Sequence, residues 1–422
     1  METITIDDLI ISVNRNGADD YTKVSFPVRY GTYTEIKTPD YIFQFNLNGE
    51  IKFIRGLGQD WPEPNEWLKR TVRNEWVYYS AGGYRGMDVY MGEFYLPCFM
   101  NMDNPIFKVT TPYRDISQKA IRSYEKLIAK LNESNGNEMP ASVSNCVKLI
   151  KKGNSAVLKH KAYKFSSILG ASIPVLPPDT RHADYDVIPI IIADGCVYNC
   201  AFCSVKTGRE FQERSYRNIS RQITDLYDFY GNDLKNYNSI FLGQNDALNA
   251  NIDLITDTAR KAYRVFDFQN SNMKRPRLFL FGSIHSFLNA NTKIFDAINL
   301  LPYYTYINIG LESFDQAALD WLKKPVSAND VEKTFFKMAV VNQKYLNIEM
   351  TSNFVLGGEL PDSHIKSFKH NTGEKLAKHC PKGAVYISPL FALGSKRDLQ
   401  KQFIELKNYS KIPTYIYLIQ HL

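Results

Sequence analysis

Hydrophobic and polar positions alternate along the first hundred residues in the way that half-buried β-strands require. In the segment 41–47, every second residue is apolar and falls on one face of a strand: Phe43, Phe45 and Leu47. Asn48-Gly49 follows, a pair suited to the positive backbone angles of a tight turn, and the alternation resumes over 51–53. This pattern predicts a β-hairpin and a β-rich N-terminal region.

A second pair of aromatic-rich segments, 76–79 and 88–91, brackets the glycine-rich stretch 81–86. Such a stretch could cradle a phosphate or a substrate, or it could connect two strands of a hairpin. Its spacing matches no phosphate-binding loop, so we favour the hairpin connection.

Helical periodicity replaces the alternation after residue 115. Asp115 is a candidate N-cap, and apolar residues recur at helical spacing from Ile116 to Leu131. The segment 132–140 has the composition of a linker.

The next segment, 141–170, contains six lysines and no acidic residue, so it carries +6 of the chain's net charge of +7. Such a segment could attract a polyanion such as RNA, or it could be the solvated face of two short helices. We favour the solvated face. The apolar sides of these helices would carry Val147, Ile150, Val157 and Leu158.

From residue 186 onward, short apolar runs alternate with helical patterns. Six runs have the length of strands: 187–193, 239–242, 278–282, 306–311, 348–356 and 385–390. Helical patterns lie between them, for example at 219–229, 252–266 and 331–343. The alternation predicts an α/β fold with a parallel sheet, either open or curled toward a barrel. In such folds the chemistry collects at the carboxyl ends of the strands.

Composition narrows the class of protein only slightly. The chain has 422 residues, 44% hydrophobic and 23% charged, which is typical of a globular protein. The N-terminus lacks the basic and apolar regions of a signal peptide, and no stretch approaches the roughly 18 apolar residues of a transmembrane helix. We therefore expect a cytoplasmic protein without a membrane partner.

Three of the six cysteines, Cys196, Cys200 and Cys203, lie within eight residues after the first of these strands. Buried structural thiols are a poor fit to a loop at the active edge of a sheet. Structural zinc sites usually show two Cys-x2-Cys pairs, and ferredoxin-like carriers use four thiolates. The Cys-x3-Cys-x2-Cys spacing favours a cluster held by three thiolates, with one iron open to another ligand.

With Phe202 before the third cysteine, the segment resembles the signature of the radical S-adenosylmethionine (radical SAM) superfamily. The resemblance extends over residues 186–395. It implies a [4Fe-4S] cluster on the three cysteines, with the amino and carboxylate groups of S-adenosylmethionine (SAM) on the fourth iron. It also implies one-electron cleavage of SAM to a 5′-deoxyadenosyl radical, which takes a hydrogen atom from the substrate.

Three further segments resemble motifs of this superfamily. The first, 242–246, stands where a Gly-Gly-Glu-like motif contacts the methionine amino group, and its Gly-Gln-Asn form is similar to that of methylthiotransferases. The second is the Gly-x-Glu-Ser segment 310–313, and the third, 353–359, follows the fifth-strand motif only loosely. The cofactor contacts that the resemblance implies are Phe202, Gly243, Gln244, Asn245, Asp246, Glu312 and Asn353.

The remaining cysteines are too few for a second cluster. Cys98 and Cys146 precede the motif, far apart, and only Cys380 follows it. We therefore expect one cluster and no second metal site. Cys380 is expected to be structural rather than a hydrogen-atom donor, and His285 could be a base, a cofactor contact or a helix cap. We assign no residue to the chemistry on the substrate.

These patterns predict four regions: a β-rich N-terminal domain of unknown role (1–115), a helical lysine-rich connector (116–185), a partial (β/α)6 radical SAM barrel (186–395) and a C-terminal extension (396–422). The expected partners are an unidentified substrate and a one-electron donor such as flavodoxin or ferredoxin. Two alternatives stay open. One is an RNA-modifying enzyme of the same chemistry, and the other is a non-catalytic iron-sulfur interaction protein.

Overall fold

The computed structural model describes residues 1–21, 29–80, 96–99, 111–133, 139–173, 175–198, 200, 209–357, 359–376, 379–390 and 396–417. The chain divides into two compact units. The first comprises 1–170, 226–237 and 270–274, and the second comprises 171–225, 238–269 and 275–422. Each unit contains its own large sheet.

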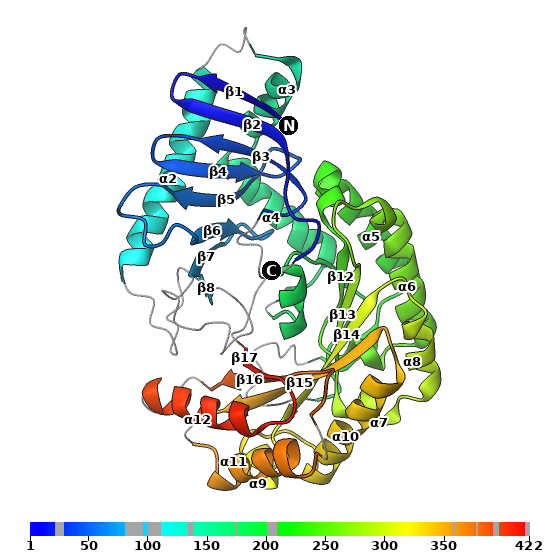
Figure 1. Ribbon diagram of the computed structural model, residues 1–422. Helices are drawn as coiled ribbons and strands as arrows, with labels where there is room; N and C mark the ends of the chain where they lie inside the picture. Colours follow the sequence, from blue (N-terminus) through cyan, green and yellow to red (C-terminus); the bar gives the residue numbers. More distant parts are fainter. Residues whose placement is uncertain are drawn as a thin grey trace. The chain divides into compact units, whose positions relative to one another are not determined.

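The sheet of the first unit is an antiparallel meander, in which each strand pairs with the next one along the chain (Figure 1). The predicted hairpin is confirmed as β4 and β5, and Gly49 in its turn has a φ of 77°. Segments 81–86 and 88–91 lie outside the described residues. The strands are β1 (Glu2–Ile6), β2 (Leu9–Asn16), β3 (Thr32–Lys37), β4 (Tyr41–Phe45), β5 (Ile51–Gly56), β6 (Trp67–Arg70), β7 (Trp76–Ser80) and β8 (Leu96–Phe99).

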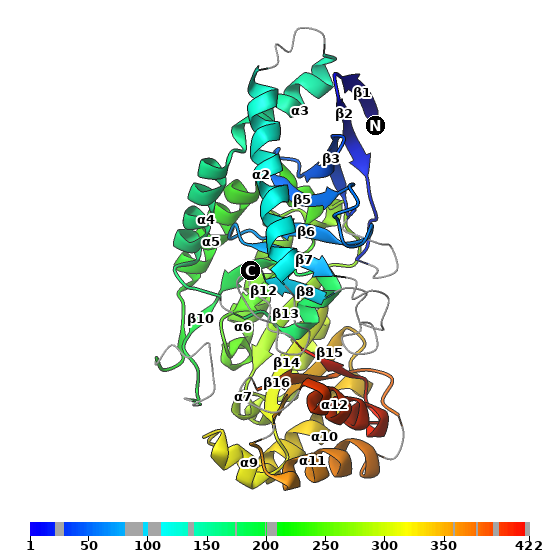
Figure 2. The ribbon, with the colours of Figure 1, turned by 90° about the vertical axis from the view of Figure 1, so that its left-hand side faces the viewer.

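One face of this sheet packs against α2 (Thr111–Glu133), which Figure 2 shows running across the strands. Phe43 and Phe45 place their ring centroids 6.5 and 6.4 Å from that of Tyr124. The helix begins before Asp115, so the predicted N-cap at Asp115 is wrong. Pro112 accounts for the earlier start, because a proline fixes φ at a helical value and is favoured in the first turn.

The two short helices predicted in the lysine-rich segment are confirmed as α3 (Ala141–Lys152) and α4 (Ser155–Leu169). The predicted inward orientation of Val157 is wrong, because 48% of this residue is exposed. Asn154 is the N-cap of α4 and accepts a hydrogen bond from the Val157 N–H, which turns Leu158 rather than Val157 toward the core. The exposed lysines of the segment are Lys148, Lys152, Lys159 and Lys164.

The second unit contains a sheet of seven parallel strands in the order β17-β16-β15-β14-β13-β12-β9. All six predicted strands are present, and β17 comes from the segment expected as a C-terminal extension. The strands are β9 (Ile188–Ile191), β12 (Ser239–Gly243), β13 (Arg277–Gly282), β14 (Tyr304–Glu312), β15 (Ile348–Leu356), β16 (Val385–Pro389) and β17 (Thr414–Ile416).

Helices connect these strands, as a parallel sheet requires. On α10 (Ala328–Lys344), Val331, Phe335 and Met338 recur at helical spacing and are buried. None of the helices in the described ranges combines the length and hydropathy that a membrane span needs. The helices are α5 (Tyr216–Tyr230), α6 (Ile252–Val265), α7 (Ile284–Asn289), α8 (Thr292–Asn299), α9 (Gln316–Trp321), α10 (Ala328–Lys344), α11 (Asp362–Lys369) and α12 (Lys396–Tyr409).

Candidate functional site

The cysteine loop leaves the carboxyl end of β9 and is closed at its base by a small antiparallel pair. β10 (Ala193–Asp194) pairs with β11 (Gln212–Glu213) on either side of the loop. The Arg214 guanidinium donates two hydrogen bonds to the Asp194 carboxylate, at 2.7 and 2.6 Å. Because a bidentate pair of this kind fixes direction as well as distance, it holds the two ends of the loop together.

Two of the three expected ligands lie in the described part of this loop. The Cys196 side chain is half-buried, and that of Cys200 is buried. Burial raises the pKa of Cys196, and the nearby Asp246 and Cys200 add to the rise, whereas the Tyr198 N–H and Lys324 oppose it. The two thiols are therefore electrostatic neighbours in a site that disfavours a free thiolate. Cys203 and Phe202 lie outside the described residues.

A buried carboxylate lies after the second strand of the sheet. Oδ1 of Asp246 accepts hydrogen bonds from the Ser283 N–H at 2.8 Å and the Ser286 hydroxyl at 2.7 Å. Its Oδ2 is buried and has no hydrogen-bond partner among the described residues. Burial raises the pKa of Asp246. An unpaired buried acceptor is rare in folded proteins, so this oxygen suits a ligand that donates a hydrogen bond.

The residues just before Asp246 are tied to the neighbouring strand. Gly243 accepts a hydrogen bond from the Ile192 N–H at 3.0 Å, and a Cβ at Gly243 would lie 2.8 Å from Cδ1 of Ile191. Gln244 is also engaged, since its side-chain amide donates to the Ser172 carbonyl at 2.5 Å. Asn245 is half-buried. The buried side chain of Gln244 therefore fixes the segment that follows β12 by its hydrogen bond to Ser172.

A buried ion pair lies at the carboxyl end of β14. Glu312 has a φ of +67°, and its Oε1 is 3.5 Å from Nζ of Lys324. Burial raises the pKa of Glu312, and Lys324 opposes the rise. Lys324 Nζ also lies 5.5 Å from the ring centroid of Tyr198 in the cysteine loop. The lysine thus connects the Glu312 segment with the cysteine loop, and no spacing in the sequence had pointed to it.

Asn353, which is half-buried, is linked by hydrogen bonds to a chain of buried polar side chains. It exchanges hydrogen bonds with Asn308, which donates to the Thr351 hydroxyl at 2.9 Å. Thr351 in turn donates to Asp179 Oδ2 at 2.6 Å, and Tyr386 donates to Oδ1 at 2.9 Å. Asp179, in the 3-10 turn Pro178–Ala183, is fully buried and was not expected from the sequence.

With this geometry in view, the comparison with known families is decisive. Residues 190–370 match the model of the radical SAM superfamily. The chain carries a radical SAM domain. The resemblance and the enzyme class expected from the sequence are thereby confirmed, and the subfamily stays open.

Solved structures similar to the chain include SuiB of Streptococcus suis, with 11% identity and a TM-score of 0.37 over 72% of this chain and 62% of that chain. SuiB is also known bound to SAM and to its precursor peptide SuiA. The cobalamin-dependent radical SAM enzyme OxsB matches 56% of this chain and 32% of that chain, with 13% identity and a TM-score of 0.35.

The chain spans less than two thirds of the length of either enzyme. At these TM-scores the two structures carry no argument about its substrate. No curated protein sequence matches it.

Two other residues considered from the sequence lie in the second unit. His285 is exposed on α7, and its backbone N–H donates to the Tyr198 hydroxyl at 2.9 Å. The cap of this helix is Ser283, which forms a capping box with Ser286, so a capping role for the His285 side chain is wrong. Cys380 is half-buried, and its backbone N–H donates to the Lys411 carbonyl at 2.8 Å.

Gly195, next to the first cysteine of the radical SAM motif, cannot accept a side chain. Its φ is +77°, and a Cβ there would lie 2.1 Å from the Glu210 carbonyl oxygen. We expect Gly195→Ala to lower the free energy of unfolding by about 1–3 kcal/mol, because both the backbone angle and the close approach oppose it. Gly58→Ala is the matched control, since a Cβ at Gly58 has no atom within 4 Å. Equal urea midpoints for the two variants would contradict this reading of the loop.

Asp179 is expected to make the stability of the radical SAM domain depend on pH. Burial raises its pKa to about 7, although hydrogen bonds from Thr351 and Tyr386 oppose the rise. The folded state therefore holds this proton up to a higher pH than the unfolded state, and stability falls as pH rises from about 4 to 7. Asp179→Asn should flatten this decline in urea unfolding, whereas Asp228→Asn, at an exposed position on α5, should not. A decline that persists in Asp179→Asn would refute the assignment.

Proposed function

We propose that the protein binds one [4Fe-4S] cluster and SAM, cleaves SAM reductively to a 5′-deoxyadenosyl radical and takes a hydrogen atom from a substrate. The observation that carries the proposal is that two neighbouring cysteines, Cys196 and Cys200, lie close to the buried Asp246 carboxylate. All three groups follow the carboxyl ends of adjacent parallel strands, where α/β enzymes place their chemistry.

The side chains of Cys196, Cys200 and Cys203 would hold the cluster. Their donor chemistry fits, because thiolates are the usual ligands of iron-sulfur clusters. The raised pKa of Cys196 does not oppose this, since a metal displaces the thiol proton on binding. When bound, the cluster would supply the electron that breaks the sulfonium bond, with a flavodoxin or ferredoxin as the proposed donor of that electron.

Charged side chains of the chain would orient SAM. The methionine part of SAM carries an ammonium and a carboxylate. Asp246 Oδ2 is the buried acceptor for the ammonium, and it has no hydrogen-bond partner among the described residues. Lys324, a buried cation close to Tyr198 and Cys196, would contact the carboxylate. Glu312 would then form an ion pair with Lys324 or accept a hydrogen bond from a ribose hydroxyl of SAM. Asn353, which is half-buried, would contact the adenine ring.

Burial of these groups matters for the reaction. Ion pairs and hydrogen bonds are stronger away from water, and a dry site keeps an organic radical from side reactions. Asp246 and Lys324 are 1% and 6% exposed, so both are already withdrawn from solvent. We expect that they align SAM without further desolvation of the protein.

A second candidate is an RNA-modifying enzyme of the same chemistry. The observation that favours it is Tyr163 on α4, which is 65% exposed between the exposed Lys159 and Lys164. An aromatic ring among lysines is the arrangement on which unpaired bases stack. Affinity for tRNA that falls steeply with salt, and that Tyr163→Ala weakens, would support this candidate. No binding at low salt would remove it.

The test of the main proposal is anaerobic incubation of the reconstituted protein with dithionite and SAM. The proposal predicts 5′-deoxyadenosine, detected by liquid chromatography and mass spectrometry, and none without dithionite. Protein that retains a reduced cluster yet forms no 5′-deoxyadenosine with any candidate substrate would support the non-catalytic interaction protein instead.

A further inference from the structure

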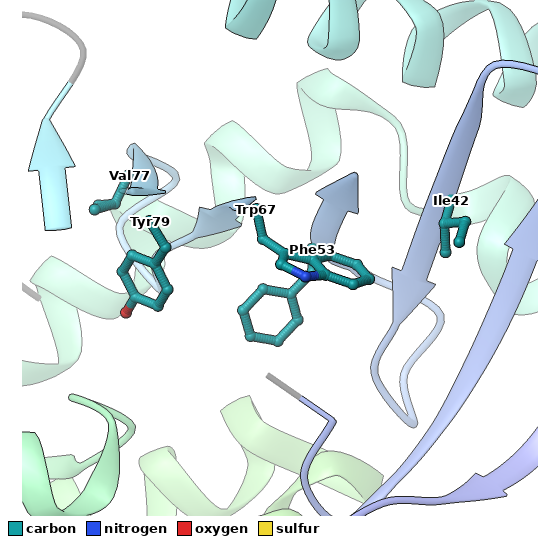
Figure 3. Packing of buried hydrophobic residues seen from close by; sticks show 5 residues of the cluster. All are labelled: Ile42, Phe53, Trp67, Val77 and Tyr79. Carbon is teal, nitrogen blue, oxygen red and sulfur yellow. The ribbon is translucent and has the colours of Figure 1, made fainter. Parts of the chain in front are cut away.

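The face of the N-terminal sheet opposite α2 carries a second buried cluster, which consists of Ile42, Phe53, Trp67, Val77 and Tyr79 (Figure 3). Strand register explains the separation of the two faces. Phe43 pairs with Ile54, and the adjacent pair Gln44–Phe53 therefore points to the other side. Trp67 is fully buried at the centre of this cluster.

Cations lie against these rings. The guanidinium carbons of Arg29 and Arg55 are 5.8 and 5.3 Å from the centroid of Trp67. Lys69, which is 4% exposed, places Nζ 5.8 Å from the Phe53 ring and 5.7 Å from the Tyr79 ring. Burial lowers the pKa of Arg55, and the charge of Arg29 lowers it further, as expected for cations drawn together without enough counter-charge.

Three N–H donors on this face are buried without an acceptor in the part of the chain that the structure describes. Nε1 of Trp67 and the Nε atoms of Arg29 and Arg55 are buried and lack a hydrogen-bond partner among the described residues. A buried donor without an acceptor is costly, and native proteins rarely keep three beside one ring system. The three groups are hydrogen-bond donors only, and they lie beside the apolar side chains of the cluster.

One carboxylate serves this face in the described part of the chain, and it is already occupied. Glu35 Oε1 lies 2.6 Å from Arg15, and Oε2 accepts from Gln44 at 3.2 Å and lies 3.7 Å from Arg29. Three arginines therefore share one acid. The Arg29 side chain is 38% exposed, so a ligand could reach this group of cations from solvent.

We propose that this face of the N-terminal sheet binds an oxyanion, a carboxylate or a phosphate group of a small molecule, through Arg29, Arg55 and the Trp67 N–H. Oxyanions offer acceptors only, and the planar guanidinium matches their geometry. The rings of Phe53 and Tyr79 beside the cations fit an apolar body attached to that group. The proposal does not depend on the radical SAM chemistry of the other unit.

The experiment measures binding of inorganic phosphate and of benzoate to the full chain by isothermal titration calorimetry, at constant ionic strength. Saturable binding of one probe is expected, and which probe binds distinguishes a phosphate from a carboxylate ligand. Trp67→Phe keeps the ring and removes the N–H, and Arg55→Gln removes a cation. Each should weaken binding by about tenfold, in keeping with a lost charge-assisted hydrogen bond.

The control is Arg122→Gln, at an exposed position of α2 in the same unit, which should bind like the unmodified chain. Arg55→Lys keeps the positive charge but lacks the planar guanidinium group, so it should also bind the probe more weakly. Thermal melts show whether each variant is folded. The proposal is overturned if neither probe binds the unmodified chain, or if folded Trp67→Phe and Arg55→Lys bind as tightly as the control.

Discussion

Replacing Cys200 by alanine is expected to reduce formation of 5′-deoxyadenosine by more than about 100-fold, because loss of even an outer-shell partner of a metal site typically costs 10–100-fold. Cys200 is buried beside Cys196 in the loop that the Asp194–Arg214 pair closes. The measurement is the rate of 5′-deoxyadenosine release under dithionite, together with iron and sulfide content after reconstitution. Both quantities should fall in the same variant.

Cys146→Ala is the matched control for this prediction. Cys146 is a half-buried cysteine of the first unit, with Sγ 2.9 Å from the Thr34 hydroxyl. We expect it to retain iron and activity. A Cys200→Ala protein with the full iron content and rate would show that this thiol does not hold the cluster.

Lys324→Met is expected to lower the free energy of unfolding by about 3–5 kcal/mol at neutral pH, because it leaves a buried carboxylate without its counter-charge. The side chains of Lys324 and Glu312 are 5% and 11% exposed. Without the lysine, the already raised pKa of Glu312 rises further, so the folded state takes up a proton that the unfolded state does not. The loss should therefore grow as pH rises above the ordinary glutamate range.

Urea unfolding at several pH values measures this effect. Lys323→Met is the matched control, since the neighbouring lysine is exposed. The double variant Glu312→Gln/Lys324→Met should recover part of the stability, because it removes the unpaired charge. If Lys324→Met were no less stable than Lys323→Met, the pair would not be an important contact. A KM for SAM in folded Lys324→Met that equals that of Lys323→Met would argue against Lys324 as the carboxylate contact.

Local patterns predicted much of this fold. The six parallel strands could be predicted because each is an apolar run between helical patterns, and the hairpin at Asn48-Gly49 because its turn needs a positive φ. β17 was missed, since it has only three residues. Val157 was misassigned because the boundary of α4 depends on the Asn154 cap, and one residue of shift rotates a helix by about 100°.

Some residues of the candidate site could likewise be predicted from local sequence patterns, and others could not. Cysteine spacing and the residues after strand ends are local signals, and they pointed to Cys196, Cys200, Asp246 and Glu312. Asp179 and Lys324 are single charges whose importance arises from contacts with residues far along the chain, such as Thr351 and Tyr198. The unpaired donors around Trp67 are likewise visible only once strand register places Arg55 and Trp67 on one face.

The most direct test of the account is Mössbauer spectroscopy of the anaerobically reconstituted ⁵⁷Fe protein before and after addition of SAM. A [4Fe-4S] spectrum in which one iron site changes when SAM is added is the predicted result, because three thiolates leave that iron open. Stoichiometric zinc in place of iron, or a cluster whose spectrum is unchanged by SAM, would contradict the account.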